Sequence, residues 1–282
     1  MSGIIWLASY PKSGNTWFRI FLANLLSNSA TAVDINTQLD TANFASREHF
    51  DRAIGWESSE LTVAQVASLR LRAQEVLAVE RPGSAEKTHD AFTEASENKP
   101  LFSKSATQCA LYFVRNPLDI AVSFSHHSAS EIDSTIAFMN NPDARSFAER
   151  NQWQLPQFLR DWSGHVTSWL DAPDFPVLAV RYEDMLDRPE ETFARACRFA
   201  GWPDEPSRIR RALHHSRFEA VQQQEKEKGF SEASPNQVFF REGRFGVWRN
   251  CLSRSQVEAL VRCHTEVMRR FGYLNANGSL AD

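Results

Sequence analysis

Three short apolar runs, each followed by a polar turn and then a longer amphipathic segment, most constrain the fold of this chain. The runs are IIWLAS at 4–9, ALYFV at 110–114 and VLAV at 177–180. Unbroken apolar runs of this length are typical of strands buried on both faces, and strands that alternate with helices form parallel sheets. A further strand is expected at 84–88. The sequence therefore predicts an α/β protein with a central parallel sheet flanked by helices.

Helical periodicity lies between and after these strands. Helices are expected at 15–26, 117–127 and from Pro189, with others at 62–79 and 155–170 and a closing helix at 253–271 capped by Ser253. The length of 282 residues suits one domain. We therefore predict a single domain, 1–282, with helical or loop insertions near 34–81 and 128–154. The charged run at 222–229 is typical of a solvated face, and a lid near 219–245 is the alternative interpretation.

Composition argues against several classes of protein. The net charge is only -4, so no basic field favours nucleic acid or an anionic membrane as partner. No stretch approaches the roughly 20 apolar residues of a membrane span, and the apolar start is too short for a signal peptide. We therefore expect a cytoplasmic protein. The four cysteines lie far apart without metal-ligand spacing, so they are expected to be buried and reduced, and no metal site is expected.

The segment YPKSGNTW at 10–17, between the first strand and its helix, predicts an anion site. Gly14 lets the backbone turn tightly, so that consecutive N–H groups can point at one anion. The following helix adds its unpaired N-terminal donors and the positive end of its dipole. Lys12 contributes a charge, and Ser13 and Thr16 contribute hydroxyl groups. The alternative is a tight turn with one exposed lysine.

A nucleoside-triphosphate P-loop is the nearest rival for this segment. That motif, GxxxxGK[ST], places its lysine directly after a glycine, whereas Lys12 precedes Gly14 here. No acidic residue ends the strand at 110–114 to hold magnesium, because Arg115 stands there. A magnesium-dependent kinase or ATPase is therefore disfavoured.

The segment at 10–17 resembles the 5′-phosphosulfate loop of the cytosolic-type sulfotransferases that use 3′-phosphoadenosine 5′-phosphosulfate (PAPS), with Asn15 where the family usually has threonine. RNPLD at 115–119 with Ser123, RYEDM at 181–185, HSRF at 215–218 and FREGRFGVW at 240–248 resemble its later motifs in the same order. The resemblance covers 4–250 and implies a P-loop-like three-layer fold. It also implies that the donor is bound by Lys12, Ser13, Gly14, Asn15, Thr16, Trp17, Arg115, Ser123, Tyr182, Ser216, Phe218, Phe240, Arg241, Glu242 and Gly243.

Within this set, the resemblance assigns Arg115, Ser123 and Arg241 to the 3′-phosphate, which a guanidinium can bind through two parallel N–H bonds. It brings Tyr182 and Phe218 to the adenine, on which an aromatic ring can stack. The chain departs from the family signature RKGxxGxW at two positions. Glu242 replaces the usual lysine and Val247 replaces the usual aspartate. Arg244 is a candidate to compensate for the first change.

The segment EKTH at 86–89 resembles the family segment that carries the general base. Histidine titrates in the range that such a base needs, so His89 is expected to deprotonate the acceptor. His126 and His127 are its nearest rivals. Lys87 is expected to touch the transferring group and Lys12 to stabilise the leaving adenosine 3′,5′-bisphosphate in an in-line displacement.

The implied activity is transfer of a sulfuryl group from PAPS to a hydroxyl or amine of a small-molecule acceptor. No metal is required. Two alternatives stay open: a P-loop kinase or NTPase of related fold, and a nucleotide-binding protein that has lost its chemistry. The two departures from the signature favour the second alternative, and the presence of Lys12 and His89 argues against it.

Overall fold

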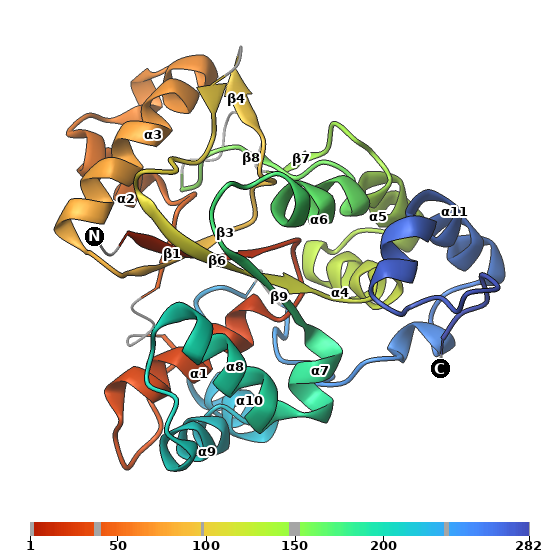
Figure 1. Ribbon diagram of the computed structural model, residues 1–282. Helices are drawn as coiled ribbons and strands as arrows, with labels where there is room; N and C mark the ends of the chain where they lie inside the picture. Colours follow the sequence, from red (N-terminus) through yellow and green to blue (C-terminus); the bar gives the residue numbers. More distant parts are fainter. Residues whose placement is uncertain (1–2, 37–40, 97–98, 147–152, 234–236, 282) are drawn as a thin grey trace. The chain divides into compact units, whose positions relative to one another are not determined.

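The computed structural model describes residues 3–36, 41–96, 99–146, 153–233 and 237–281 (Figure 1). The chain divides into two compact units. The first comprises Met1–Tyr10, Thr41–Phe113 and Asn141–Ala179, and the second Pro11–Asp40, Val114–Asn140 and Val180–Asp282. Each unit is thus assembled from stretches that are distant in the sequence. The single domain with insertions and a lid stays a prediction, and residues 234–236 of that lid lie outside the described residues.

The main sheet has the strand order β2-β3-β1-β6-β9. The strand β1 (Ile4–Ser9) pairs in parallel with β3 (Ala85–Thr88) and β6 (Thr107–Val114), and β2 (Ala42–Asn43) pairs in parallel with β3. The edge strand β9 spans Val177–Arg181. Every residue of β1 is buried, which explains why its first five residues are apolar. The predicted strands and the parallel sheet are confirmed.

Helices of the first unit lie against this sheet: α3 (Val63–Glu80) contacts β1, and α6 (Trp162–Asp171) contacts β6 through His165 and Tyr112. Thr62 caps α3 in a capping box with Gln65, as local sequence allows. The shorter elements of the unit are α2 (Arg47–Ile54), the 3-10 helix η1 (Ser58–Glu60), and the paired strands β4 (Glu94–Ser96) with β5 (Lys99–Pro100) and β7 (Arg145–Ser146) with β8 (Gln157–Phe158).

The prediction of one helix over 155–170 was wrong at its start. Residues Gln157–Phe158 form β8, and the helix begins only at Trp162. The Asp161 side chain accepts a hydrogen bond from the backbone N–H of Gly164, which makes it the N-cap. The apolar periodicity continues through 155–170 and therefore predicted one helix. Pro156 and the Asp161 cap instead confine the helix to α6, which β8 precedes.

The second unit is helical. Its elements are α1 (Asn15–Ser27), α4 (Pro117–Ser128), α5 (Ile132–Met139), α7 (Tyr182–Asp187), α8 (Pro189–Ala200), α9 (Pro206–His215), α10 (Phe218–Lys228), the 3-10 helix η2 (Val247–Asn250) and α11 (Arg254–Arg270). Ser253 caps α11 as predicted, in a capping box with Gln256. The helix predicted after β9 begins at Pro189, as expected. The sequence did not predict α7, a short helix that ends just before that proline.

All four cysteines lie in the described ranges and are free thiols. Cys109 and Cys197 are buried, whereas Cys251 and Cys263 are exposed, so the prediction of buried thiols was wrong for the last two. Over the described part of the chain, no helix combines the length and the apolar character needed to cross a membrane.

Candidate functional site

The predicted site residues fall into two groups that follow the two units. Lys87 and His89 lie in the first unit, and every predicted donor-binding residue lies in the second. The predicted donor-binding residues come from α1 and its preceding loop, from positions 115 and 123 before and within α4, from α7, from position 216 directly after α9, from α10, and from the segment 240–243 before η2.

The loop before α1 has the geometry of an anion site. Lys12 and Gly14 both have positive φ, at 66° and 96°, a conformation that turns successive N–H groups to one side. Gly14 is the N-cap of α1 and no side chain bonds the first turn, so the donors at this helix end are not used by a cap. The Ser13 hydroxyl is buried and has no hydrogen-bond partner among the described residues. Asn15 and Thr16, in the first turn, are also buried.

Arg115 connects this loop to two other predicted parts of the site. Its Nη1 donates to the Lys12 carbonyl at 3.1 Å and its Nη2 to the Arg244 carbonyl at 3.3 Å. The guanidinium also lies 4.3 Å from the centre of the Tyr182 ring. The sequence reading predicted that these segments converge on one ligand, and the structure brings them into direct contact within the second unit.

Tyr182 lies against the loop as well as against Arg115. A Cβ on Gly14 would stand only 2.6 Å from Cδ2 of the tyrosine ring, so only glycine fits there. The neighbouring Glu183 is buried and accepts hydrogen bonds from the Asn116 backbone N–H at 3.0 Å and from the Tyr273 hydroxyl at 2.9 Å. Burial raises the pKa of the Glu183 carboxyl. These bonds hold α7 against the segment that carries Arg115.

Asp119 belongs to the RNPLD motif at 115–119, and the sequence predicted no role for it. Its buried carboxylate accepts hydrogen bonds from the backbone N–H of Gly246 at 2.7 Å and of Trp248 at 3.2 Å. It thereby anchors the glycine-rich C-terminal segment to α4. Ser123, half-buried, follows four residues later on the same face of the helix. The i, i+4 spacing is the sequence signal that could have placed Asp119 on the same helix face as Ser123.

The segment 240–243 is positioned by α10. Both carboxylate oxygens of Glu225 accept backbone N–H groups, from Phe239 at 2.6 Å and Phe240 at 2.9 Å. Phe240 belongs to a hydrophobic cluster with Ile20, Ile35, Val221 and Phe230. The next residues are therefore presented from an anchored backbone. Lys12 reaches this segment too, with its Nζ 3.9 Å from the centre of the Phe239 ring, a cation–π contact that nothing in the sequence signalled.

Gly243 has a φ of 61°, and a Cβ there would stand 2.4 Å from the Phe218 ring. The ring therefore packs directly on the glycine. Glu242, the departure from the family signature, pairs with Arg244 at 2.9 Å and lies 3.9 Å from Nε of Arg241. The Glu242 carboxylate thus lies near two exposed arginines, where the usual lysine would add a further positive charge.

Trp17 contacts two other predicted donor-binding residues, Ser216 and Tyr182. Trp17 donates from its indole Nε1 to the Ser216 carbonyl at 2.9 Å, and its ring lies edge-on to Tyr182 at 6.1 Å. The Ser216 hydroxyl itself donates to the Ala212 carbonyl at 2.9 Å. In this state Ser216 therefore contacts Trp17 through its backbone.

Positive charge gathers at this site even though the chain is acidic overall. Burial lowers the pKa of His126, and the nearby Arg241 and Lys12 cations lower it further. His126 is therefore neutral at pH 7. A neutral imidazole beside two cations leaves a local positive potential, which suits an anionic ligand.

In the first unit, His89 directly follows β3. Its Nδ1 lies 2.8 Å from the Ser9 carbonyl oxygen and 3.2 Å from the Ser9 hydroxyl. Because a carbonyl can only accept, Nδ1 carries a proton, and in the neutral form of the ring Nε2 is the proton acceptor. The ring is half-buried, and Lys87, two residues earlier, is buried.

Asp90 holds the chain immediately after His89. Its carboxylate pairs with the buried Arg70 at 2.8 Å and accepts the Phe158 N–H at 2.8 Å, and its carbonyl accepts the Trp169 indole N–H at 2.9 Å. Removing one partner from a buried ion pair of this kind is strongly destabilising. The backbone around His89 is therefore fixed by several independent contacts.

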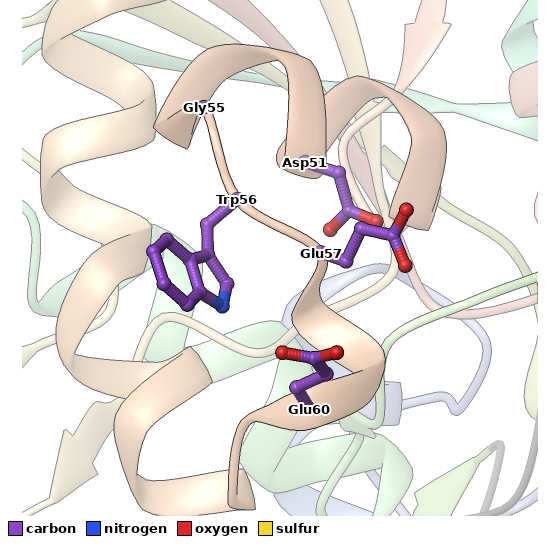
Figure 2. A pocket seen from close by; sticks show the side chains of 5 residues that line it. All are labelled: Asp51, Gly55, Trp56, Glu57 and Glu60. Carbon is purple, nitrogen blue, oxygen red and sulfur yellow. The ribbon is translucent and has the colours of Figure 1, made fainter.

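One surface pocket lies in the first unit, next to the 3-10 helix η1. It is lined by Asp51, Gly55, Trp56, Glu57 and Glu60, with the indole on one side and the carboxylates on the other (Figure 2). None of the residues predicted to bind the donor or to take part in catalysis lines it. Among the described residues, no group of three or more His, Cys, Asp or Glu side chains could hold a metal ion.

Comparisons with known proteins find sulfotransferases among the similar sequences. Sulfotransferase 2A1 of rat is 29% identical over 182 residues, which are 62% of this chain and 61% of that protein. Sulfotransferase 2B1 of human is 25% identical over 284 residues, or 94% of this chain and 66% of that protein. The chain thus spans about six tenths of the length of the first of these relatives.

Two solved structures share the fold. Mouse sulfotransferase SULT7A1 complexed with PAP has a TM-score of 0.59 at 21% identity, and the match covers 95% of this chain and 84% of that one. Retinol dehydratase in complex with androsterone and the inactive cofactor PAP has a TM-score of 0.63 at 18% identity, covering 97% and 83%. These likenesses confirm the predicted fold class, an α/β fold of the sulfotransferase type. Because the family model described as "Sulfotransferase domain" matches residues 3–272, the chain belongs to the sulfotransferase-domain family.

Proposed function

We propose that this protein transfers a sulfuryl group from PAPS to a hydroxyl or amine of a small-molecule acceptor. The observation that carries the proposal is the position of Arg115, whose two terminal nitrogens bond the Lys12 loop and the Arg244 segment. Two segments expected to hold opposite ends of one nucleotide are joined by a single cation. Family membership and the sulfotransferases among the relatives support the same reaction.

The residues present fit a bisphosphorylated nucleotide. Because Gly14 and Gly243 have no Cβ, Tyr182 and Phe218, the two rings expected near the adenine, pack directly on the two segments expected to bind the phosphates. The Ser13 hydroxyl is buried without a partner, which is costly unless a ligand accepts its hydrogen bond. Lys12 and Arg241 add positive charge.

In the proposed reaction, Nε2 of His89 takes the proton of the acceptor hydroxyl as the acceptor oxygen forms a bond to sulfur. The bond between sulfur and the bridging phosphate oxygen breaks in line, and adenosine 3′,5′-bisphosphate leaves. Lys12 and the loop N–H groups stabilise the charge that develops on this oxygen, and Lys87 contacts the transferring group. Ser9, which orients the His89 ring, precedes Lys12 by three residues in the chain.

Binding of adenosine 3′,5′-bisphosphate, compared with adenosine 5′-monophosphate, tests the donor assignment. The 3′-phosphate should improve affinity at least about 10-fold, because each hydrogen bond to a charged group contributes about 1.5–3 kcal/mol. Titration calorimetry measures both ligands. Equal affinities would remove Arg115, Ser123 and Arg241 from the 3′-phosphate site.

Turnover tests the chemistry separately. PAPS is incubated with a panel of phenols, aliphatic and steroid-like alcohols and amines, and mass spectrometry detects the added SO3. His89→Ala should abolish turnover and keep the affinity for adenosine 3′,5′-bisphosphate, whereas His214→Ala, at an exposed position of α9, should leave both unchanged. A near-native rate in His89→Ala would exclude His89 as the base.

A further inference from the structure

A second histidine, which the proposed reaction does not use, lies beside the candidate base. His165 on α6 is fully buried. Its Nε2 is 3.0 Å from the carbonyl oxygen of His89, and its Nδ1 is 2.8 Å from the hydroxyl of Tyr112 on β6. A buried imidazole of this kind costs free energy unless both nitrogens are bonded, and here both are.

The direction of each hydrogen bond follows from its partners. The His89 carbonyl can only accept, so Nε2 of His165 carries a proton. Burial lowers the pKa of His165 to about 4, so the ring is neutral at pH 7 and its Nδ1 is an acceptor. The hydroxyl of Tyr112 must then be the donor. The chain of bonds therefore runs in one direction, from Tyr112 through His165 to the backbone of His89.

Tyr112, where this series of hydrogen bonds begins, lies next to the residues that orient the His89 ring. Tyr112 is paired with Ala8 in the register of β1 and β6, and its side chain also hydrogen-bonds the backbone of Tyr10. The His89 ring bonds the carbonyl of Ser9, between these two residues. The His89 ring is thus hydrogen-bonded directly to the end of β1. The His89 carbonyl is connected to the same strand end through His165 and Tyr112.

We propose that Tyr112 and His165 are positioning residues for His89, which hold its backbone so that the ring can keep the Nδ1–Ser9 bond and present Nε2 to the acceptor. The proposal rests on the proposed function, because it takes His89 as the base. Its physical basis is that a side chain anchored at one nitrogen and at its own carbonyl has little freedom to turn. Misplacement of a reacting group by about 1 Å can cost about 100-fold in rate.

The test compares Tyr112→Phe, which removes only the hydroxyl, with Thr107→Val as a matched control. Thr107 is in the same strand, and its hydroxyl accepts the Trp6 indole N–H at 2.9 Å, away from His89. Thr107→Val also loses the hydrogen bond that the hydroxyl donates to the Ser103 carbonyl at 2.7 Å. Both variants thus lose hydrogen bonds of the first unit, so both should unfold at a lower denaturant concentration. Only Tyr112→Phe should lower kcat, by about 10- to 100-fold, with the KM for PAPS unchanged.

Two further variants separate positioning from general loss of stability. His165→Gln keeps a donor that can reach the His89 carbonyl, so it should retain more activity than His165→Leu.

Each outcome has a distinct meaning. If His89→Ala retains its rate, the proposed base is wrong. If His89→Ala is inactive but Tyr112→Phe matches Thr107→Val in kcat, the proposed base stands and the positioning role of Tyr112 and His165 is overturned. If His165→Gln and His165→Leu lose the same amount of activity, the role of the hydrogen bond to the His89 carbonyl is also overturned.

Discussion

Replacement of Gly243 by alanine tests how the C-terminal segment and the aromatic ring of Phe218 depend on each other. The backbone at Gly243 has a φ of +61°, and a Cβ added there would stand 2.4 Å from the Phe218 ring. Carbon atoms in contact lie about 3.5–4.0 Å apart. Alanine at this position therefore forces the ring to move by more than about 1 Å or the segment to retract.

The substitution has two costs that can be measured separately. A non-glycine residue in the left-handed region costs about 1–2 kcal/mol, which lowers the free energy of unfolding. Displacement of Phe218 removes a candidate stacking surface for the adenine, worth about 1–3 kcal/mol. The affinity for adenosine 3′,5′-bisphosphate should therefore fall about 5- to 150-fold.

Gly201→Ala is the matched control. Gly201 also has positive φ, +79°, but its added Cβ would meet nothing within 4 Å. It ends α8 and belongs to no predicted site segment. Chemical denaturation should show a similar stability loss in both variants, and titration calorimetry should show weaker nucleotide binding only in Gly243→Ala. Native affinity in Gly243→Ala, or the same loss of affinity in both variants, would refute the packing argument.

Three further changes have defined outcomes. Asp119→Ala should lower the free energy of unfolding by about 3 kcal/mol, because each hydrogen bond to a charged group contributes about 1.5–3 kcal/mol. It should also weaken nucleotide binding. A native denaturation midpoint would contradict the anchoring role of Asp119. Glu242→Lys should tighten binding of adenosine 3′,5′-bisphosphate about 5-fold at low salt and less at high salt, and calorimetry showing no change would mean that this position does not face the phosphate. The folded-state pKa of His165 is lowered by burial to about 4, so the unfolded chain binds its proton first as pH falls. Stability is therefore lost between about pH 6.5 and 4, by up to about 3 kcal/mol. Denaturation across this range should show that the free energy of unfolding falls less steeply with pH in His165→Gln than in the native protein. The same pH dependence in both proteins would contradict the lowered pKa of His165.

Much of the fold could be predicted because its signals are local. The strand β1 is apolar at every position but the last and is buried throughout, and Thr62 and Ser253 form capping boxes with residues three positions ahead. Such signals depend only on neighbours in the chain. The same reasoning failed at 155–161, where apolar periodicity continued through residues that form a strand and a cap rather than a helix.

The members of the candidate site could also be named from the sequence, but their mutual contacts could not. The i, i+4 spacing of Asp119 and Ser123 places them on one helix face, yet it does not reveal that Asp119 binds a backbone 127 residues away. The cation–π contact of Lys12 with Phe239 likewise had no signal in either segment. Contacts of this kind depend on which faces pack together.

By itself, the amino-acid sequence determined the α/β class, the positions of the main strands and helices, and the family to which the motifs point. It did so because hydrophobic period, glycine freedom and helix capping act over a few residues. Only the tertiary structure decided that Arg115 joins the loop of Lys12 to the segment of Arg244, and that His165 bonds the backbone of His89. Those choices depend on packing between elements far apart in the chain, where a buried polar group must find a partner that local sequence does not name.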